Sequence, residues 1–97
     1  RLAAVILSAE REDRVREAAM LLRRAAPAGE GPAGGRIVTF GPAPAPLAML
    51  RGRHRVRFLV QAGRQVRLQD HLRRWLGPIR LPAGVRLTVD VDPQSFL

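Results

Sequence analysis

Hydrophobic and polar residues follow two different periods along the first third of the chain. Residues 2–8 form a short apolar run that is bounded by charged residues and is typical of a buried strand. Residues 10–26 then change to helical spacing, with acidic residues in the first turn and arginines in the last, as the helix dipole favours. We therefore expect a strand followed by an amphipathic helix.

The charged residues of this first helix have the spacing of surface ion pairs. Glu10 precedes Arg14 by four positions, and Glu12 precedes Arg16 by four. Opposite charges at that spacing lie side by side on a helix. We expect most arginines of this helix to be solvated surface residues without a ligand.

The middle of the chain is rich in glycine and proline. Residues 27–35 predict a loop, and residues 36–40 predict a second strand. Residues 41–46 read Gly-Pro-Ala-Pro-Ala-Pro, which we expect to stop this strand, because each proline removes a donor and fixes φ. A structured hairpin arm is the preferred interpretation of that segment.

Strict alternation returns in residues 53–61, which predict a third strand. One face would carry His54, Val56, Phe58 and Val60, and the other Arg53, Arg55, Arg57 and Leu59. A second helix is expected after Gly63 and up to about Leu76. Its apolar stripe would be Leu68, Leu72, Trp75 and Leu76, and its polar side Arg67, Asp70, His71 and Arg74. Residues 85–91 alternate again and predict a fourth strand.

This order, β-α-β-β-α-β, predicts an α+β ferredoxin-like fold (the split βαβ arrangement), an antiparallel four-stranded sheet with two helices on one face. The length fits one domain, residues 1–97. The chain begins at Arg1, so we expect a part of a longer protein.

The absence of cysteine excludes disulfides and thiolate metal sites. The apolar runs are too short to span a bilayer, so a cytoplasmic chain without a membrane partner is expected.

The net charge of +9 predicts a polyanionic partner, because neutralising phosphates releases condensed counterions. All 17 basic residues are arginine, however, and a GC-rich genome gives the same bias. Composition also leaves an acidic protein partner open.

The strongest candidate for binding is the basic segment at residues 51–57. Its alternate arginines are Arg51, Arg53, Arg55 and Arg57. On one face of a strand they could contact successive phosphates through bidentate hydrogen bonds. Protection of an edge strand by charge is the alternative. Arg64, Arg67 and Arg74 could extend the patch, although Asp70 has the spacing to pair with Arg67 and Arg74.

Little in the sequence favours catalysis, and no catalytic, cofactor-binding or metal-binding residue is assigned. Ser8 and Ser95 lack the context of a nucleophile. Asp90 and Asp92 would point the same way on a strand, where a turn or a salt bridge is the better interpretation. The two histidines, His54 and His71, are expected to be hydrogen-bonded on the surface, and Trp75 is expected in the core.

Four segments in order resemble the closing domain of the PriA (primosomal protein N′) family of bacterial replication-restart helicases. They are GPAPAP at 41–46, RGRHRVRFLVQ at 51–61, VRLQ at 66–69 and VDVDP at 89–93. Arg53, Arg55, Arg67 and Gln69 match the pattern of that family. His54 stands where the family often has Tyr and Val56 where it often has Trp, which puts base stacking by this strand in doubt.

The resemblance implies a fold similar to a small-subunit ribosomal protein and a domain that docks branched or single-stranded DNA at stalled forks. It also implies a neighbouring helicase core, driven by ATP and Mg²⁺, and a zinc-binding region, all outside this chain, with location at the bacterial nucleoid. The acidic tail of single-stranded DNA-binding protein is a further implied partner. Alternatives from the residues are a protein-interaction domain and a stand-alone RNA-binding protein of ribosomal type; an enzyme is the least favoured.

Overall fold

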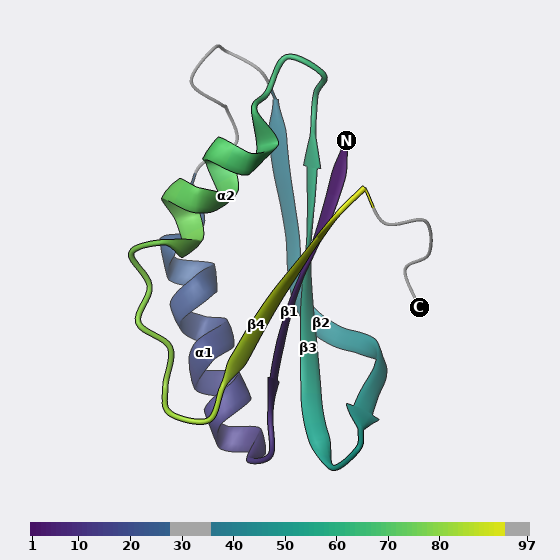
Figure 1. The fold of residues 1–97 in the computed structure, drawn as a ribbon, viewed down its shortest axis with the longest axis vertical. Coiled ribbons are helices and arrows are strands. Elements are labelled where there is room, and N and C mark those ends of the chain that lie inside the picture. The colour runs from purple at the N-terminus through teal and green to yellow at the C-terminus, as the bar shows by residue number, and fades with distance from the viewer. Residues whose placement is uncertain (28–35, 93–97) are drawn as a thin grey trace.

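The computed structural model describes residues 1–27 and 36–92, and these form one sheet with two helices (Figure 1). Residues 28–35 of the predicted loop at 27–35 lie outside the described residues, as do Pro93 and Ser95. The elements are β1 (Leu2–Ala9), α1 (Glu12–Ala25), β2 (Ile37–Leu50), β3 (Arg53–Ala62), α2 (Leu68–Leu76) and β4 (Arg86–Val91). No helix in this part of the chain is long and apolar enough to cross a membrane.

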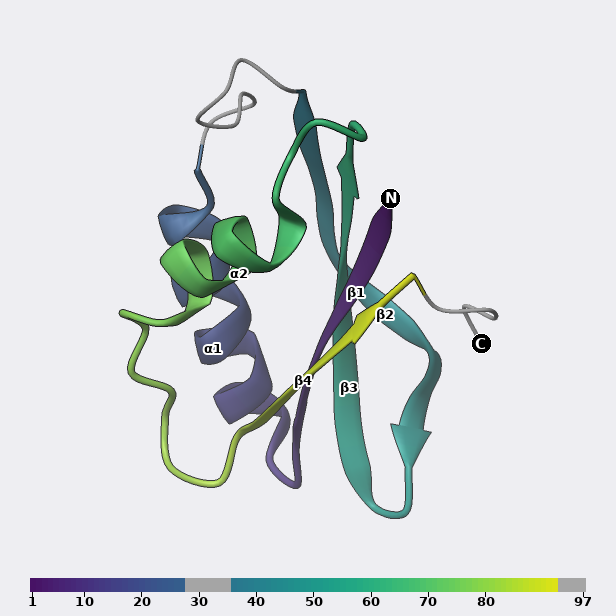
Figure 2. The ribbon, with the colours of Figure 1, turned by 45° about the horizontal axis from the view of Figure 1, so that its top comes forward.

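The sheet has the strand order β2-β3-β1-β4, and all neighbouring strands are antiparallel. Both helices cover the same face of the sheet, and the far end of the β2–β3 hairpin curves away from it (Figures 1 and 2). This arrangement confirms the predicted ferredoxin-like fold.

The core lies between β1 and the helices. β1 pairs with β3 on one edge and with β4 on the other. Its successive side chains therefore point alternately to the two faces of the sheet. Those on the helix side are Ala3, Val5, Leu7 and Ala9, and all are fully buried. The predicted apolar face of α1 (Val15, Ala18, Ala19 and Leu22) packs on them.

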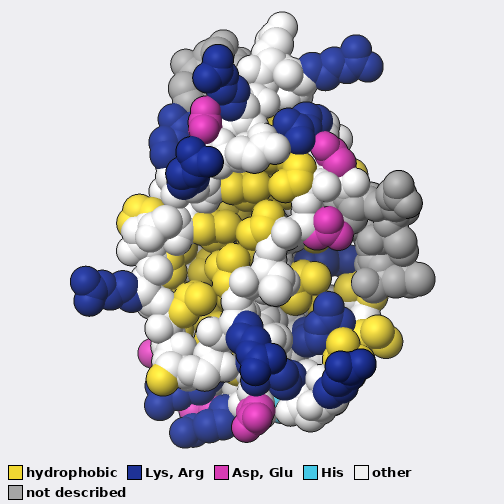
Figure 3. All heavy atoms as spheres, viewed as in Figure 1, with side chains coloured by type: hydrophobic (Ala, Val, Ile, Leu, Met, Phe, Trp, Pro, Cys, Tyr) yellow, Lys and Arg dark blue, Asp and Glu magenta, His cyan; other side chains and the backbone are white. Residues whose placement is uncertain are grey.

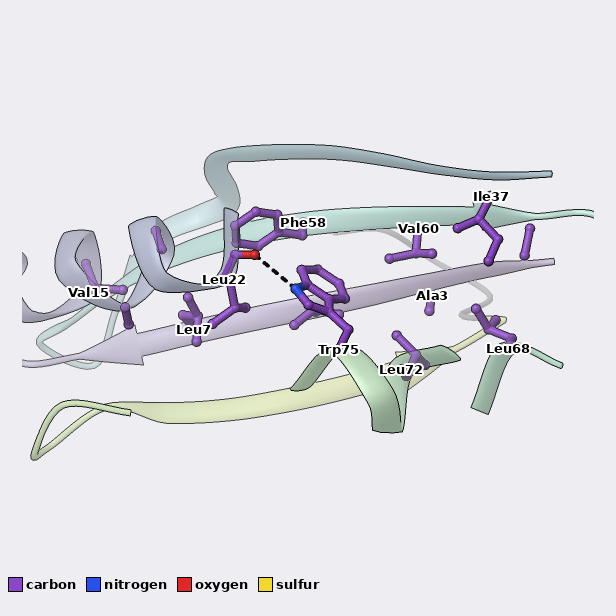
Figure 4. Close-up of a cluster of buried hydrophobic side chains, with 14 of the residues drawn as sticks. Ala3, Leu7, Val15, Leu22, Ile37, Phe58, Val60, Leu68, Leu72 and Trp75 are labelled. Carbon is purple, nitrogen blue, oxygen red and sulfur yellow. Dashed lines mark hydrogen bonds between the residues drawn. The ribbon is translucent and has the colours of Figure 1, made fainter. Parts of the chain in front are cut away.

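Trp75 joins both helices to the sheet, which confirms its expected place in the core (Figure 4). Its indole Nε1 donates a hydrogen bond of 2.9 Å to the carbonyl oxygen of Leu22 in α1. Its ring meets Phe58 of β3 edge-on, with 5.6 Å between the ring centroids. The donor of this large apolar side chain is thereby satisfied inside the core.

The second strand does not stop at residue 40 as expected, and that prediction was wrong. β2 continues to Leu50, with shifts in its pairing to β3 between Phe40 and Ala43 and between Pro44 and Met49. β2 is an edge strand, so a proline that lacks a donor can face away from the ladder. Gly41 makes the first shift possible: its φ is +119°, and a Cβ there would lie 2.8 Å from the carbonyl oxygen of Arg57.

The second helix also differs from its prediction. It begins at Leu68, and Val66 instead forms a turn in which its N–H donates to the carbonyl of Gly63. His71 was expected on the surface, and this was wrong: it is 2% exposed. With Leu68, Leu72 and Trp75 it forms the buried face of α2, and its Nε2 has no hydrogen-bond partner among the residues that the structure describes.

The buried imidazole should make stability depend on pH. Burial lowers the pKa of His71 below its usual 6.5, and the nearby charge of Arg74 adds to this. Below that usual value the unfolded chain binds a proton that the folded chain does not. The free energy of unfolding should therefore decrease as the pH is lowered. Urea denaturation between about pH 7.5 and about pH 5.5 measures this slope. The slope should flatten in His71→Leu and persist in the control His54→Leu; a slope unchanged in His71→Leu would contradict it.

Candidate nucleic-acid interface

Both helices cover one face of the sheet and leave the other face open. We call it the uncovered face. Arg55 and Arg57 of β3 lie there, opposite Ser8 and Ile6 of β1. Their neighbours Phe58 and Val60 point the other way and are fully buried under the helices. Two guanidinium groups of β3 therefore share a face with uncharged side chains of the central strand.

Arg53 begins the same row but is held by the fold. Its Nε donates to Ser8 Oγ at 3.2 Å, and its Nη2 donates to the carbonyl oxygens of Ser8 at 2.9 Å and Gly84 at 3.1 Å. These bonds join the beginning of β3, the end of β1 and the turn before β4. Arg53 is thus first of all a structural anchor.

Arg55 and Arg51 are less constrained. Arg55 makes one exposed hydrogen bond, from Nη1 to the carbonyl oxygen of Leu47 at 3.1 Å. Arg51 does not continue the row, because it lies in the hairpin turn. It is exposed with φ 50°, and Gly52 follows with φ 75°. Positive φ at both central residues is what a tight type I′ hairpin turn requires.

Arg64, Arg67 and Arg74 lie apart from this row. Arg64 and Arg67 precede α2, at the opposite end of β3 from Arg53, and Arg74 lies in the last turn of α2. Since α2 packs on the covered face, the structure does not bring these three together with Arg55 and Arg57. Oδ1 of Asp70 lies 3.7 Å from Nη1 of Arg73. The spacing instead predicts Arg67 and Arg74 as partners of Asp70.

The surface of α1 also departs in part from the predicted pairing. Arg16 and Glu12 form the expected ion pair. The pairing of Glu10 with Arg14 was wrong, because Glu10 lies before the first residue of α1 and Arg14 instead pairs with Glu17 at 3.3 Å.

Phe40, the last residue of β2 before the first pairing shift, is a candidate that the sequence pattern did not indicate. Phe40 pairs with Leu59, so it lies on the uncovered face, and it is 51% exposed. An aromatic ring that ends an apolar strand is usually assigned to a core. Only the register of the strands places Phe40 on the same face as Arg57.

Two hollows flank this region. The first, which we call the basic hollow, has a volume of about 530 Å³. It is lined by residues 9–11, Arg14, Arg53 and residues 83–86. The second, the α1–arm groove, has about 490 Å³ and lies between α1 and the β2–β3 hairpin. Its apolar lining includes Val15, Met20, Pro44 and Val56, and its polar lining Glu12, Arg16, His54 and Arg55.

Asp92 fastens the end of β4 to the beginning of β1, in agreement with the expected salt bridge. Its Oδ1 accepts from the backbone N–H of Leu2 at 3.1 Å, and its Oδ2 lies 3.0 Å from Nε of Arg1. The Leu2 N–H and then Arg1 lower the pKa of Asp92. Within residues 1–27 and 36–92, no three His, Cys, Asp or Glu side chains are grouped as a metal site would need.

Fold and charge define the class of this chain: a small ferredoxin-like α+β domain with a basic uncovered sheet face. The chain belongs to the primosomal protein N C-terminal domain family, whose model matches residues 1–94. This match includes residues 1–40, which carry none of the four motifs that resemble that family.

Curated relatives agree with this membership. The chain is 35% identical over 94 residues to the "Replication restart protein PriA" of Rickettsia felis and of Rickettsia conorii, and 31% identical to that of Rickettsia prowazekii. Each alignment covers 97% of this chain and 14% of the relative. The chain therefore spans about a seventh of the length of these proteins.

The contrast between Arg53 and Arg55 can be measured as stability. Arg53→Ala removes three hydrogen bonds and should lower the free energy of unfolding by about 1–2 kcal/mol. Arg55→Ala, the matched control, removes one exposed hydrogen bond and should cost less than about 0.5 kcal/mol. Urea denaturation of both variants tests this, and equal costs would show that Arg53 is no anchor.

Proposed function

We propose that this chain is the DNA-docking C-terminal domain of a replication-restart helicase, and that it holds branched or single-stranded DNA through the uncovered face of its sheet. The observation that carries the proposal is the row of Arg55 and Arg57 on a face that neither α1 nor α2 covers. The net charge of +9 and the printed name of the relatives, "Replication restart protein PriA", support it.

The geometry favours contacts to the DNA backbone. Residues two apart on a strand are separated by about 7 Å, so Arg55 and Arg57 can each meet a different phosphate. Ser8 and Ile6 beside them carry no charge that would compete. Such contacts fix the position of DNA without reading its sequence.

Phe40 adds a reason to favour single strands. Bases of an unpaired strand stack on exposed aromatic rings whatever their sequence, and four-stranded sheets with aromatics on an uncovered face bind single strands in this way. Phe40 lies on the uncovered face with about half of its surface accessible. We assign it as the stacking platform beside the arginine row.

A second candidate function rests on the α1–arm groove. Its apolar lining is bordered by Arg16, His54 and Arg55, with Glu12 as the one acidic residue among those that line it. This suits a short peptide with both acidic and apolar residues, such as the acidic tail of single-stranded DNA-binding protein.

The exposed apolar tip of the hairpin is the surface we assign to contact with a helicase core in the same polypeptide; it consists of Leu47, Met49 and Leu50. ATP, Mg²⁺ and zinc would be bound by that larger part, and the role of this domain is docking without catalysis.

DNA docking should depend on the arginine row and on salt. Arg55→Ala/Arg57→Ala should weaken binding of forked and single-stranded DNA by about tenfold or more. The log–log salt slope should fall by about one unit for each phosphate that the variant no longer neutralises. Fluorescence anisotropy over a salt series with forked, single-stranded and duplex DNA measures both quantities.

The matched control is Arg23→Ala/Arg24→Ala, which removes the same charge from the exposed last turn of α1. If the two double variants lose affinity equally, net charge explains the binding and the row does not. A folded chain that binds no DNA at low salt would end the proposal. Saturable binding of an acidic peptide by that chain would then favour the second candidate.

Stacking on Phe40 should be specific to single strands. Phe40→Ala should cost about 1–3 kcal/mol in binding to single-stranded DNA and leave duplex binding nearly unchanged. Leu47→Ala, which also truncates an exposed apolar side chain on β2, is the control. Equal losses on single-stranded and duplex DNA in Phe40→Ala would contradict the stacking role. The same anisotropy titrations measure these changes.

A further inference from the structure

The basic hollow lies where the beginnings of α1 and β3 meet the turn before β4. Its charged lining residues are Glu10, Arg11, Arg14, Arg53 and Arg86. Basic side chains lie at both ends of the face shown in Figure 3, and those at the lower end surround the beginning of α1 and of β4. Four cations and one anion around a single hollow favour an anionic occupant.

Arg53 gives the hollow a fixed cation. Three hydrogen bonds from Nε and Nη2 hold its guanidinium against Ser8 and Gly84. Its remaining group, Nη1, donates to no atom among the residues that the structure describes. A guanidinium that is already oriented loses little conformational entropy when it binds an anion.

Arg86 of β4 and Arg53 of β3 lie on either side of β1, and both line the hollow. Arg86 pairs with Ser8 of β1, the same residue to which Arg53 donates two hydrogen bonds. Arg86 is exposed and has no ion pair within the described part of the chain. Two guanidinium groups that line one hollow repel each other, and an anion between them converts this repulsion into attraction.

Arg14 supplies a cation that is only weakly engaged. It pairs with Glu17 at 3.3 Å, and the two side chains are 40% and 54% exposed. Ion pairs this exposed contribute little stability. An anion in the hollow can therefore draw on Arg14 at small cost, whereas Arg11 is held by Asp13 through two hydrogen bonds of 3.0 and 2.7 Å.

We propose that the basic hollow binds one phosphate group, with Arg53 and Arg86 as its main ligands and Arg14 as a third. The proposal rests on the DNA docking proposed above, because Arg53 begins the row that Arg55 and Arg57 continue on the uncovered face. The row of Arg57, Arg55 and Arg53 leads across the uncovered face to the hollow. The phosphate could be the terminal group of a strand or an internal group of the backbone.

The first test uses inorganic phosphate and the 97-residue chain, followed by ¹⁵N NMR. The amide of Gly84 and the Nε–H signals of Arg53 and Arg86 should shift together and saturate. Arg86→Ala and Arg14→Ala should each weaken the affinity by roughly fivefold. Glu10→Gln should strengthen it, because a lining carboxylate is removed. Arg24→Ala, an exposed arginine at the other end of α1, should change nothing.

Shifts that do not saturate and that spread over all exposed arginines would overturn the phosphate site. So would an affinity that is unchanged in Arg86→Ala. The three lining variants (Arg86→Ala, Arg14→Ala and Glu10→Gln) avoid Arg53, whose loss affects the fold itself. The opposite signs expected for Glu10→Gln and Arg86→Ala separate binding from a structural effect.

The second test uses single-stranded DNA with and without a 5′ phosphate. Stronger shifts of Gly84 and Arg86 with the phosphorylated strand identify a terminal phosphate, and equal shifts identify an internal one. If DNA shifts Arg55 and Arg57 but leaves Gly84 and Arg86 unchanged, the hollow is overturned and DNA docking stands. If inorganic phosphate binds and DNA does not, the hollow stands and DNA docking fails.

Discussion

The central position of β1 is the constraint on which the other features of this domain depend. β1 is hydrogen-bonded along both edges, so each of its side chains must point either into the helices or onto the uncovered face. Val5 and Leu7 are fully buried on the helix side. Antiparallel register then places Arg55 and Arg57 opposite Ser8 and Ile6 on the other side. The packing of the core and the position of the basic row are therefore two results of one alternation.

Local sequence pattern predicted the order of the elements, the two faces of β3 and the buried Trp75, because periodicity and side-chain size determine them. It did not predict the length of β2, because only the position of that strand at an edge makes its prolines acceptable. It placed His71 on the surface, because histidine is polar and local sequence does not show that this position of α2 faces the core. The basic hollow depends on register and on a turn far away in sequence, which no local pattern shows.

Arginines of equal charge have different roles in this fold, and their neighbours decide which. Arg53 uses its donors to join three chain segments, whereas Arg16 balances Glu12 on the surface of α1. Arg55 makes one exposed hydrogen bond and stays accessible. A net charge counts these residues equally. Binding of a polyanion depends instead on those arginines whose N–H donors are not already used within the fold.

The prolines of β2 also affect how one copy of the chain meets another. An edge strand normally offers a row of free N–H and C=O groups, on which a strand from a second molecule can add. Pro42, Pro44 and Pro46 lack N–H groups, and the pairing with β3 shifts around Pro42 and again around Pro46. The β2 edge thus offers no continuous ladder for intermolecular sheet growth. A domain whose sheet has one face uncovered by its helices is protected at this edge against aggregation.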